Sequence, residues 1–534
     1  MSITVLLSIV AFSLTPAAPA AAPKGKVWNP VTFANVLTGL PKAYYDPKRL
    51  PPKRAFVSGL TRLERSVPEV LVAGPDAQGV LRVRVKGKER QFPSGDLKTW
   101  MAMGDRLLTV LRWIDGVLGD PDQRDVLQYA VIKGVLEVLD PHTTFYTPEE
   151  YRQQQSRFTG SMVGIGVSLV ADKGRIVVRA LVPGGPAKKG GLRVGDVLVQ
   201  VDALAMTNLS PSIAAGRLRG QAGTKVTVVV LRKGRKRRFT LVRREIVLPS
   251  VEAKMLPGRV ALVTITGFPK NALAGFERAI KPVRRKKPRA WIIDLRGNEG
   301  GYILQAARMA DHFLPKGQIC KAVGRGGQKV VTWDVKPKKN RITEPVVVLI
   351  NRRTASAAEI LSGTLSVNDR ALLIGERTWG KGTVQKLYPM PDKSALKLTM
   401  WQYLLAGDIP IQTAAIVPDI ELRGVDLRPR ALRFITAGRA ENEASQAGRI
   451  DAMGGKAAWK GRPVLPPVRY LPGDADPMLQ LAHRIAKVAK GTRRAALLQV
   501  ARPLVAALRK TQDGAIHKQL KASGVDWQAG AGQT

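Results

Sequence analysis

Two residues, Ser356 and Lys381, have side chains that could perform nucleophilic chemistry. Ser356 lies where a strand is expected to end and a helix to begin, and Lys381 lies in a glycine-rich segment after the next apolar run. Ser356 follows the apolar, β-branched run 346–350, which predicts a strand buried on both faces, and a helical pattern runs from Ala355 onward. Lys381 has a glycine on each side, which allows a close approach of the backbone. A serine at a helix N-terminus also has backbone N–H groups beside it that can stabilise an oxyanion.

The chemistry that this pair permits is specific. A serine hydroxyl is a weak nucleophile until a base takes its proton, and a lysine can be that base only in its neutral form. Burial or nearby positive charge would lower the pKa of the lysine enough to allow this. If the backbone is extended here, Lys381, Thr383 and Gln385 lie on one face of the strand. Ser356 and Lys381 are therefore candidate catalytic residues.

Each motif also has a purely structural interpretation. Ser356-Ala-Ala-Glu359 matches a capping box, in which the serine only satisfies the start of a helix. An isolated Gly-Lys-Gly is usually a solvated turn. The histidines of the chain are His142, His312, His483 and His517. None of them lies close to Ser356 in the sequence, so a Ser-His-Asp site, which needs a distant histidine, is the weaker alternative. We interpret His142 as structural.

The order of these motifs resembles that of the C-terminal processing peptidases, also called tail-specific proteases. The segments that carry the resemblance are 354–360, 375–376 and 380–385. The resemblance implies that Ser356 is the nucleophile, Lys381 the general base and Gln385 the group that orients the lysine. It also implies a crotonase-like α/β serine peptidase core at residues 250–423, which requires no cofactor and no metal.

A glycine-rich turn provides a candidate oxyanion hole. The segment 294–301, DLRGNEGG, follows an apolar strand and precedes a helix that starts at Tyr302, and such a junction is a ready anion site. It is similar to the family segment whose glycine pair supplies an oxyanion-hole amide. The resemblance implies this role for Gly301, or for Gly300, with the N–H of Ala357 as the second donor. Without the resemblance, the motif would be a turn of no chemical consequence.

Residues 160–247 resemble a PDZ domain. The glycine loop and strand at 164–169 are followed by Gly185-Pro-Ala187 and by the pattern GLRVGDVLV at 191–199. Glycine-flanked apolar strands occur in many β-rich domains, but the ordered series favours PDZ. In PDZ domains the loop holds a peptide carboxylate while the peptide adds a strand to the sheet. The residues to which the resemblance gives a peptide-binding role are Gly164, Ile165, Gly166 and Val167.

The N-terminal residues predict export, followed by a mainly helical region. Residues 1–22 hold an apolar run and then small residues, which is typical of a signal peptide. No basic residue precedes the run, so a hydrophobic anchor is the alternative. We expect a protein of the periplasm or cell envelope, with secretion as the alternative. Residues 24–155 have helical apolar spacing at 107–118 and 126–139, and an alternating stretch at 80–92 predicts a hairpin.

The composition limits the other function classes. The chain has 86 Lys and Arg against 41 Asp and Glu, a formal net charge of +45, which favours either an anionic neighbour, such as an envelope surface, or high solubility. Nucleic acid is not an expected partner, because the basic residues are dispersed and aromatic residues make up only 5%. The single Cys320 excludes an internal disulfide, and the scattered histidines lack metal-ligand spacing.

Beyond residue 423 the resemblance ends. Residues 424–475 are rich in Gly, Ala, Pro and charge, and we interpret them as linker-like. Residues 476–534 are interpreted as a basic helical C-terminal extension, with amphipathic helices at 476–490 and 494–508.

The sequence therefore predicts an α/β multidomain serine endopeptidase. It would recognise exposed C-terminal tails of protein substrates through its PDZ domain and cleave them through an acyl-enzyme. An activating adaptor protein and an oligomeric state are left open. The alternatives are a catalytically silent PDZ scaffold and a cationic envelope-binding protein.

Overall fold

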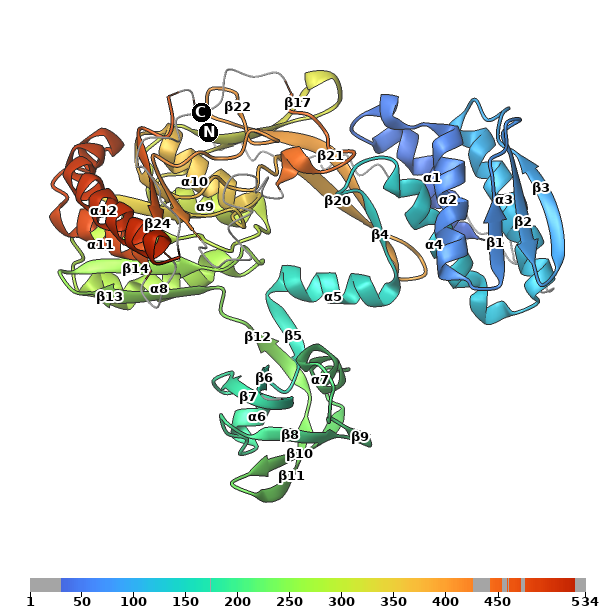
Figure 1. Ribbon diagram of the computed structural model, residues 1–534, viewed down its shortest axis with the longest axis horizontal. Helices are drawn as coiled ribbons and strands as arrows, with labels where there is room; N and C mark the ends of the chain where they lie inside the picture. The colour runs from blue at the N-terminus through green and yellow to red at the C-terminus, as the bar shows by residue number, and fades with distance from the viewer. Residues whose placement is uncertain are drawn as a thin grey trace, which may run out of the picture.

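The computed structural model describes residues 30–172, 174–425, 442–453, 459, 461–471 and 476–523. Figure 1 shows an α/β core with the C-terminal helices on the left, the N-terminal region on the right and the PDZ-like region below. The predicted α/β multidomain fold, with helical regions before the PDZ-like region and after the core, is confirmed. The predicted signal peptide at 1–22 lies outside the described residues.

The N-terminal region has a hydrophobic core of its own. Its helices are α1 (Val31–Ala43), α2 (Pro52–Ser66), α3 (Trp100–Leu118) and α4 (Arg124–Glu137), with 3-10 turns at Pro47–Arg49 and Pro121–Gln123. They pack on a small antiparallel sheet of β1 (Val70–Ala73), β2 (Val80–Val85) and β3 (Lys88–Pro93). The hairpin β2–β3 is the one predicted at 80–92, and its turn is made by Lys86 and Gly87.

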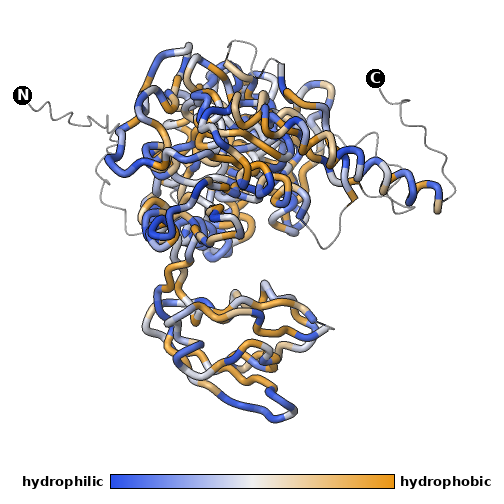
Figure 2. Tube along the Cα trace, turned by 90° about the vertical axis from the view of Figure 1, so that its left-hand side faces the viewer, coloured by the Kyte–Doolittle hydropathy of each residue, from blue (hydrophilic) through white to orange (hydrophobic). Residues whose placement is uncertain are grey.

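The PDZ-like region is joined to the rest of the chain by a two-stranded ribbon. Helix α5 (Pro148–Thr159) leads into β5 (Ser161–Gly164), and β5 pairs with the last strand of this region, β12 (Arg244–Val247). The other elements are β6 (Val167–Asp172), β7 (Arg175–Leu181), α6 (Pro186–Lys189), β8 (Val197–Val201), β9 (Leu204–Ala205), α7 (Pro211–Leu218), β10 (Lys225–Arg232) and β11 (Arg235–Val242). The sheet has the order β11-β10-β8-β7-β6, so β6 lies at its edge. Figure 2 shows a hydrophilic stretch at the end farthest from the core, where the basic residues around the turn of the β10–β11 hairpin lie.

A mixed sheet forms the centre of the α/β core. Its strands in spatial order are β13 (Val251–Leu256), β14 (Val260–Ile265), β15 (Ala290–Asp294), β18 (Val346–Ile350), β19 (Leu372–Gly375), β23 (Ile420–Gly424) and β24 (Leu465–Tyr470). Neighbouring strands are parallel except β13 and β14. The helices α8 (Ala272–Arg285), α9 (Ile303–Ala310) and α10 (Ala357–Val367) cover one face, and α11 (Pro477–Val488) and α12 (Arg494–Ala522) cover the other. Every residue of β18 is buried, as its continuous apolar run predicts.

A second sheet connects this core to the N-terminal region. It contains β17 (Lys329–Asp334), β16 (Gln318–Val323), β21 (Ala395–Leu405) and β20 (Thr383–Pro389), and both β22 (Ile409–Pro410) and β4 (Thr144–Tyr146) pair with β21. A 3-10 turn, Arg325–Gly327, joins β16 to β17. Figure 1 shows the β20–β21 hairpin reaching from the core to the N-terminal region. Met390, Leu396 and Leu398 are buried in the N-terminal core. The β20–β21 hairpin, which follows Lys381, therefore packs on both the α/β core and the N-terminal region.

The described part of residues 424–475 packs on the core, in contrast to the predicted linker-like stretch. Strand β24 extends the main sheet beside β23, and the 3-10 turn Glu443–Ser445 carries a fully buried glutamate. Apolar residues of β24, including Val468, pack with α11 and α12, which explains why the segment follows the core surface.

Buried ion pairs fix the C-terminal helices to the core. The carboxylate of Asp419 is fully buried and lies 2.7 Å from Arg494 and 3.3 Å from Arg462. Arg494 starts α12, which continues to Ala522 and is longer than the predicted helix 494–508. Among the helices of the described residues, none is long and apolar enough to cross a membrane.

Candidate active site

Ser356 lies at the junction between β18 and α10, as predicted, and its backbone is strained. It is half-buried and has φ 54° and ψ −118°, a conformation that residues with a side chain rarely adopt. Its N–H donates to the Glu359 carboxylate at 2.8 Å, which is the contact expected when a capping-box glutamate reaches back. The strained turn places Ser356 directly before the first amide of the helix, Ala357.

The backbone of Lys381 is bound to the same carboxylate. Its N–H donates to Glu359 Oε2 at 2.9 Å, and the N–H of Gly380 and the hydroxyl of Thr378 donate to Oε1. Glu359 is fully buried, and burial raises its pKa to about 7 although these hydrogen bonds favour the ionised form. One buried carboxylate therefore ties the serine turn to the lysine loop. The sequence indicated Glu359 only as a capping residue.

The amine of Lys381 lies in surroundings that favour its neutral form. Burial lowers the pKa of Lys381 below its ordinary value. The negative charges of Glu443, Asp140 and Glu359 oppose this lowering of the pKa without reversing it. Within the part of the chain that the structure describes, no hydrogen bond joins Lys381 Nζ to Ser356 Oγ.

The two glycines predicted for the oxyanion hole have different roles. The N–H of Gly300 donates to Asn298 Oδ1 at 2.9 Å and so is already occupied. A Cβ atom on Gly300 would lie 2.8 Å from Ser356 Cβ, so this position must be glycine to pack against the serine. The amides of Gly301 and Ala357 donate no hydrogen bond to another described residue. They are the candidate donors to an oxyanion, and Gly300 is not.

Asn298 fixes this arrangement and was not singled out from the sequence. It is fully buried, and its side-chain amide donates to the carbonyl of Ile265 at 2.9 Å. The backbone carbonyl of Asn298 accepts the N–H of Ala355, the residue before Ser356, at 2.9 Å. Asn298 thus joins the glycine turn to the serine turn. The only signal in the sequence was its place inside the family-like segment 294–301.

Gln385 and Thr383 lie on one face and are hydrogen-bonded to each other, although the pairing register of β20 shifts between Val384 and Gln385. Among the described residues, no hydrogen bond joins Gln385 to the lysine amine. Gln385 Nε2 donates to Thr383 Oγ1 at 3.0 Å and to Thr399 Oγ1 at 3.3 Å. Thr399 in turn donates to the buried carboxylate of Asp140 at 3.0 Å. Gln385 therefore belongs to a hydrogen-bonded layer beside Lys381 that includes an aspartate from the N-terminal region.

A second buried carboxylate, Glu443, reaches the site from the C-terminal side. It lies 2.8 Å from His142 Nε2, and it accepts hydrogen bonds from Gln412 Nε2 at 2.8 Å and Trp379 Nε1 at 3.1 Å. Trp379 is two residues before Lys381. Glu443 could not be singled out from the sequence, because nothing in its Gly-, Ala- and charge-rich surroundings marks it. The contact gives His142 a partner at the site.

The four residues predicted to bind peptide form the turn into β6. Ile165 is buried in the core of the PDZ-like region, and its carbonyl accepts the N–H of Ala187 at 2.8 Å. Gly166 has φ +78°, which favours glycine, and Val167 begins β6. The outer edge of β6 pairs with no other described strand, so it can accept an added strand.

The matches to known proteins cover both of these regions. Residues 259–422 match the model of peptidase family S41, and residues 163–242 match the model of the PDZ domain. The chain is 30% identical to the carboxy-terminal-processing protease of Bartonella bacilliformis over 305 residues, which cover 56% of this chain and 70% of that protein. It is 33% identical to the carboxyl-terminal-processing protease of Synechocystis sp. over 301 residues, 54% of this chain and 70% of that protein.

The carboxy-terminal processing protease CtpA of Bacillus subtilis is also similar, at 32% identity over 300 residues, which cover 56% of this chain and 64% of that protein. These matches agree with the prediction of a peptidase made from the order of the motifs. The chain thus belongs to the carboxy-terminal processing proteases of peptidase family S41, and it is a serine-type peptidase that carries a PDZ domain.

Proposed function

We propose that this peptidase binds the C-terminal tails of protein substrates in its PDZ domain and cleaves them with a Ser356/Lys381 dyad. The observation that carries the proposal is the shared carboxylate of Glu359, which accepts the backbone N–H groups of both residues at 2.8 and 2.9 Å. A shared hydrogen-bond partner fixes the position of the nucleophile relative to the base, and the correct orientation of reacting groups is a large part of catalysis.

In the proposed reaction, the neutral amine of Lys381 takes the proton of Ser356 while Oγ forms a bond to the scissile carbonyl carbon. The resulting oxyanion accepts hydrogen bonds from the amides of Gly301 and Ala357. When the intermediate collapses, the C–N bond breaks and the leaving amine takes the proton from Lys381. Water then hydrolyses the acyl-enzyme, with Lys381 again as the base. For the first step, Lys381 Nζ must come within hydrogen-bond distance of Ser356 Oγ.

Tail binding is proposed at the turn 164–167 and the edge of β6. Backbone amides of the glycine turn would hold the terminal carboxylate, and the tail would add a strand beside β6. We further propose that the enzyme is exported, on the basis of residues 1–22, and works in the periplasm or cell envelope, with secretion as the alternative. An activating adaptor and an anionic envelope surface are the partners that fit a basic peptidase with a separate tail-binding domain.

The test compares the wild type with Ser356→Ala and Lys381→Ala on an unstructured Gly/Ser-rich polypeptide that ends in an apolar tail. We expect cleavage to fall by at least about 1,000-fold in both variants, while tail binding stays unchanged. Lys386→Ala, which removes a lysine from β20, the strand that follows Lys381, is the matched control and should cleave normally. Turnover by Ser356→Ala would overturn the dyad. Tail binding without cleavage by the wild type would favour the silent scaffold.

A further inference from the structure

We propose that Glu443 is a positioning residue for Lys381, so that the segment 442–453 completes the active site from outside the matched peptidase region. The inference rests on the proposed dyad. The family match ends at residue 422, and Glu443 lies beyond it. It is nevertheless fully buried in the site, where a glutamate side chain needs partners for both carboxylate oxygens.

Glu443 holds the loop before Lys381 through side chain and backbone. Its carboxylate accepts the indole N–H of Trp379 at 3.1 Å, and its own N–H donates to the Trp379 carbonyl at 3.0 Å. This pair of contacts fixes both the direction of the Trp379 ring and the path of the chain that leads into Lys381.

The same carboxylate also controls the other side of the lysine. It accepts Gln412 Nε2 at 2.8 Å, and Gln412 Oε1 accepts the N–H of Gly382 at 2.8 Å. A Cβ atom on Gly382 would lie 2.4 Å from the Gln412 nitrogen, so the two backbones are in close contact. Glu359 binds the backbone of Lys381 itself, and Glu443 holds the residues before and after it, Trp379 directly and Gly382 through Gln412.

The charge of Glu443 acts on the lysine amine as well as on the loop. Burial raises the pKa of Glu443, but hydrogen bonds from His142, Gln412 and Trp379 and the charge of His142 bring its pKa below the ordinary value, so it stays ionised. The charged groups that face Lys381 are Glu443, Asp140, Glu359 and Lys397. Glu443 opposes the lowering of the Lys381 pKa more strongly than Asp140 and Glu359 do. Its removal would therefore favour the neutral amine.

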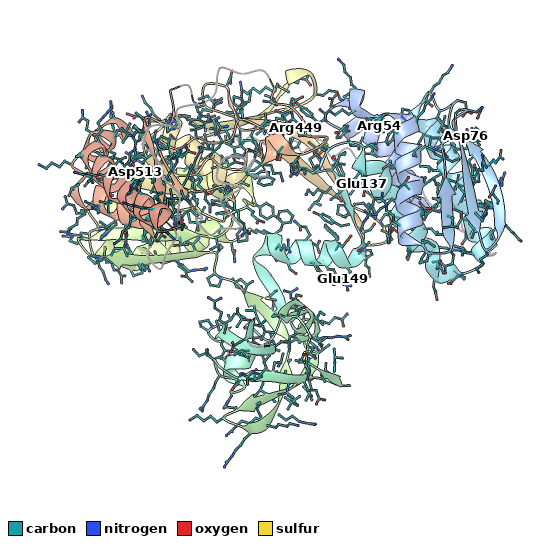
Figure 3. All side chains as sticks on the ribbon, viewed as in Figure 1. Arg54, Asp76, Glu137, Glu149, Arg449 and Asp513 are labelled. Carbon is teal, nitrogen blue, oxygen red and sulfur yellow. The ribbon has the colours of Figure 1, made fainter. Side chains whose placement is uncertain are left out.

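The segment 442–453 also contacts the N-terminal region, so it connects the active site to that region. Arg49 donates to the Gly448 carbonyl at 2.8 Å, and Gln402 of β21 binds the Asp451 carbonyl at 2.8 Å. Figure 3 shows Arg449 on the side of the core that faces the N-terminal region. The position of Glu443 thus depends on how the segment 442–453 packs between the α/β core and the N-terminal region.

The experiment measures the titration of Lys381 without relying on turnover. Trace labelling of amines with acetic anhydride, followed by mass spectrometry across pH, reports the pKa of Lys381 in the full-length protein. In Glu443→Gln we expect the midpoint for Lys381 to fall by roughly one pH unit, because an opposing charge nearby shifts a pKa by about this much. The acid limb of kcat/KM on the apolar-tailed polypeptide should move in the same direction. Asp451→Asn, an exposed acid of the same segment, is the control and should leave both midpoints in place.

Loss of positioning is tested at the pH of maximal activity. We expect Glu443→Ala to lower kcat by about 100-fold, and Trp379→Phe, which keeps the ring but removes the N–H donor, to lower it less. Trp379→Phe also keeps the test open should Glu443→Ala fail to fold. An unchanged Lys381 midpoint in Glu443→Gln, or full kcat in both positioning variants, would overturn the role of Glu443. Ser356→Ala, run in parallel, separates this result from a failure of the dyad itself.

Discussion

Ser356 and Lys381 donate their backbone N–H groups to one oxygen of Glu359, at 2.8 and 2.9 Å, so the proposed nucleophile and base are linked through a single buried carboxylate. The other oxygen of Glu359 accepts the N–H of Gly380 at 2.7 Å and the hydroxyl of Thr378. Four donors therefore converge on a group with no access to solvent. Such a group is costly to alter, because each donor would lose its partner.

Glu359→Gln should damage activity and stability together. The amide keeps the size of the carboxylate, but its NH₂ group faces N–H donors that it cannot satisfy. We expect the free energy of unfolding to fall by about 2–4 kcal/mol and kcat by about 100-fold. Urea unfolding and cleavage of the apolar-tailed polypeptide measure the two effects. Glu252→Gln, an exposed position on β13 of the same core, should change neither. A fully active Glu359→Gln would show that the shared carboxylate is dispensable.

Gly300→Ala should reduce cleavage without preventing the protein from folding. The added Cβ would lie 2.8 Å from Ser356 Cβ and 3.0 Å from the Ala357 nitrogen, and Gly300 has φ +101°. The serine turn must shift, and a misplaced nucleophile costs about 100-fold in rate. Gly297→Ala is the matched control, since Gly297 has φ +73° in the same turn but open space around its Cβ position. It carries the backbone strain alone. Equal kcat values for the two variants would contradict the steric argument.

Ser356 and Lys381 could be predicted because local sequence carries their chemistry. An apolar strand, a helix start and a glycine-flanked lysine are each readable within a few residues, and their order along the chain is the family pattern. The helical N-terminal region, the PDZ domain and the α/β core follow from the same kind of local signal. The choice between Gly300 and Gly301 does not, because it depends on which amide the Asn298 side chain binds.

Glu443 and Asp140 could not be predicted as neighbours of Lys381. They come from distant segments, one before and one after Lys381 in the sequence, and only folding brings them together around the lysine. The stretch that holds Glu443 has the composition of a linker, so its burial depends on tertiary contacts with His142, Trp379 and Gln412 that no local pattern encodes. Residues 476–534 were predicted to be a helical extension, but the predicted helix 494–508 is shorter than α12, because the second half of α12 buries few residues and so lacks a strong apolar period.

Gly166→Ala should weaken tail binding while leaving the peptidase site intact. Gly166 has φ +78°, and an added Cβ would lie 3.1 Å from Ile246 and 3.2 Å from Val182, so the turn before β6 must move. We expect affinity for a peptide with an apolar C-terminus to fall by about 10-fold, roughly 1.4 kcal/mol. Gly174→Ala has a similar φ of +76° in the β6–β7 turn with nothing near its Cβ, and it should bind normally. Calorimetry with Ser356→Ala as the background avoids cleavage of the peptide.

Asp392 lies at the tip of the β20–β21 hairpin and fastens it to the N-terminal region. Its carboxylate accepts the hydroxyls of Thr32 at 2.7 Å and Tyr129 at 2.9 Å, from α1 and α4. Burial raises the pKa of Asp392, but hydrogen bonds from Ser394, Thr32 and Tyr129 outweigh it and hold the pKa below its ordinary value. The hairpin also carries Gln385, so this contact bears on the site as well as on stability.

Asp392→Asn should lower the free energy of unfolding by roughly 1–3 kcal/mol at neutral pH. Because the folded pKa of Asp392 is depressed, its contribution is complete above the unfolded value of about 3.9 and is lost as pH falls through the folded value. The difference in stability between wild type and Asp392→Asn should therefore shrink only below about pH 4. Lys393→Asn, an exposed change in the same turn, should match the wild type at every pH. Urea unfolding at several pH values measures both, and a difference that persists unchanged to the lowest pH would rule out the ionised Asp392 as its source.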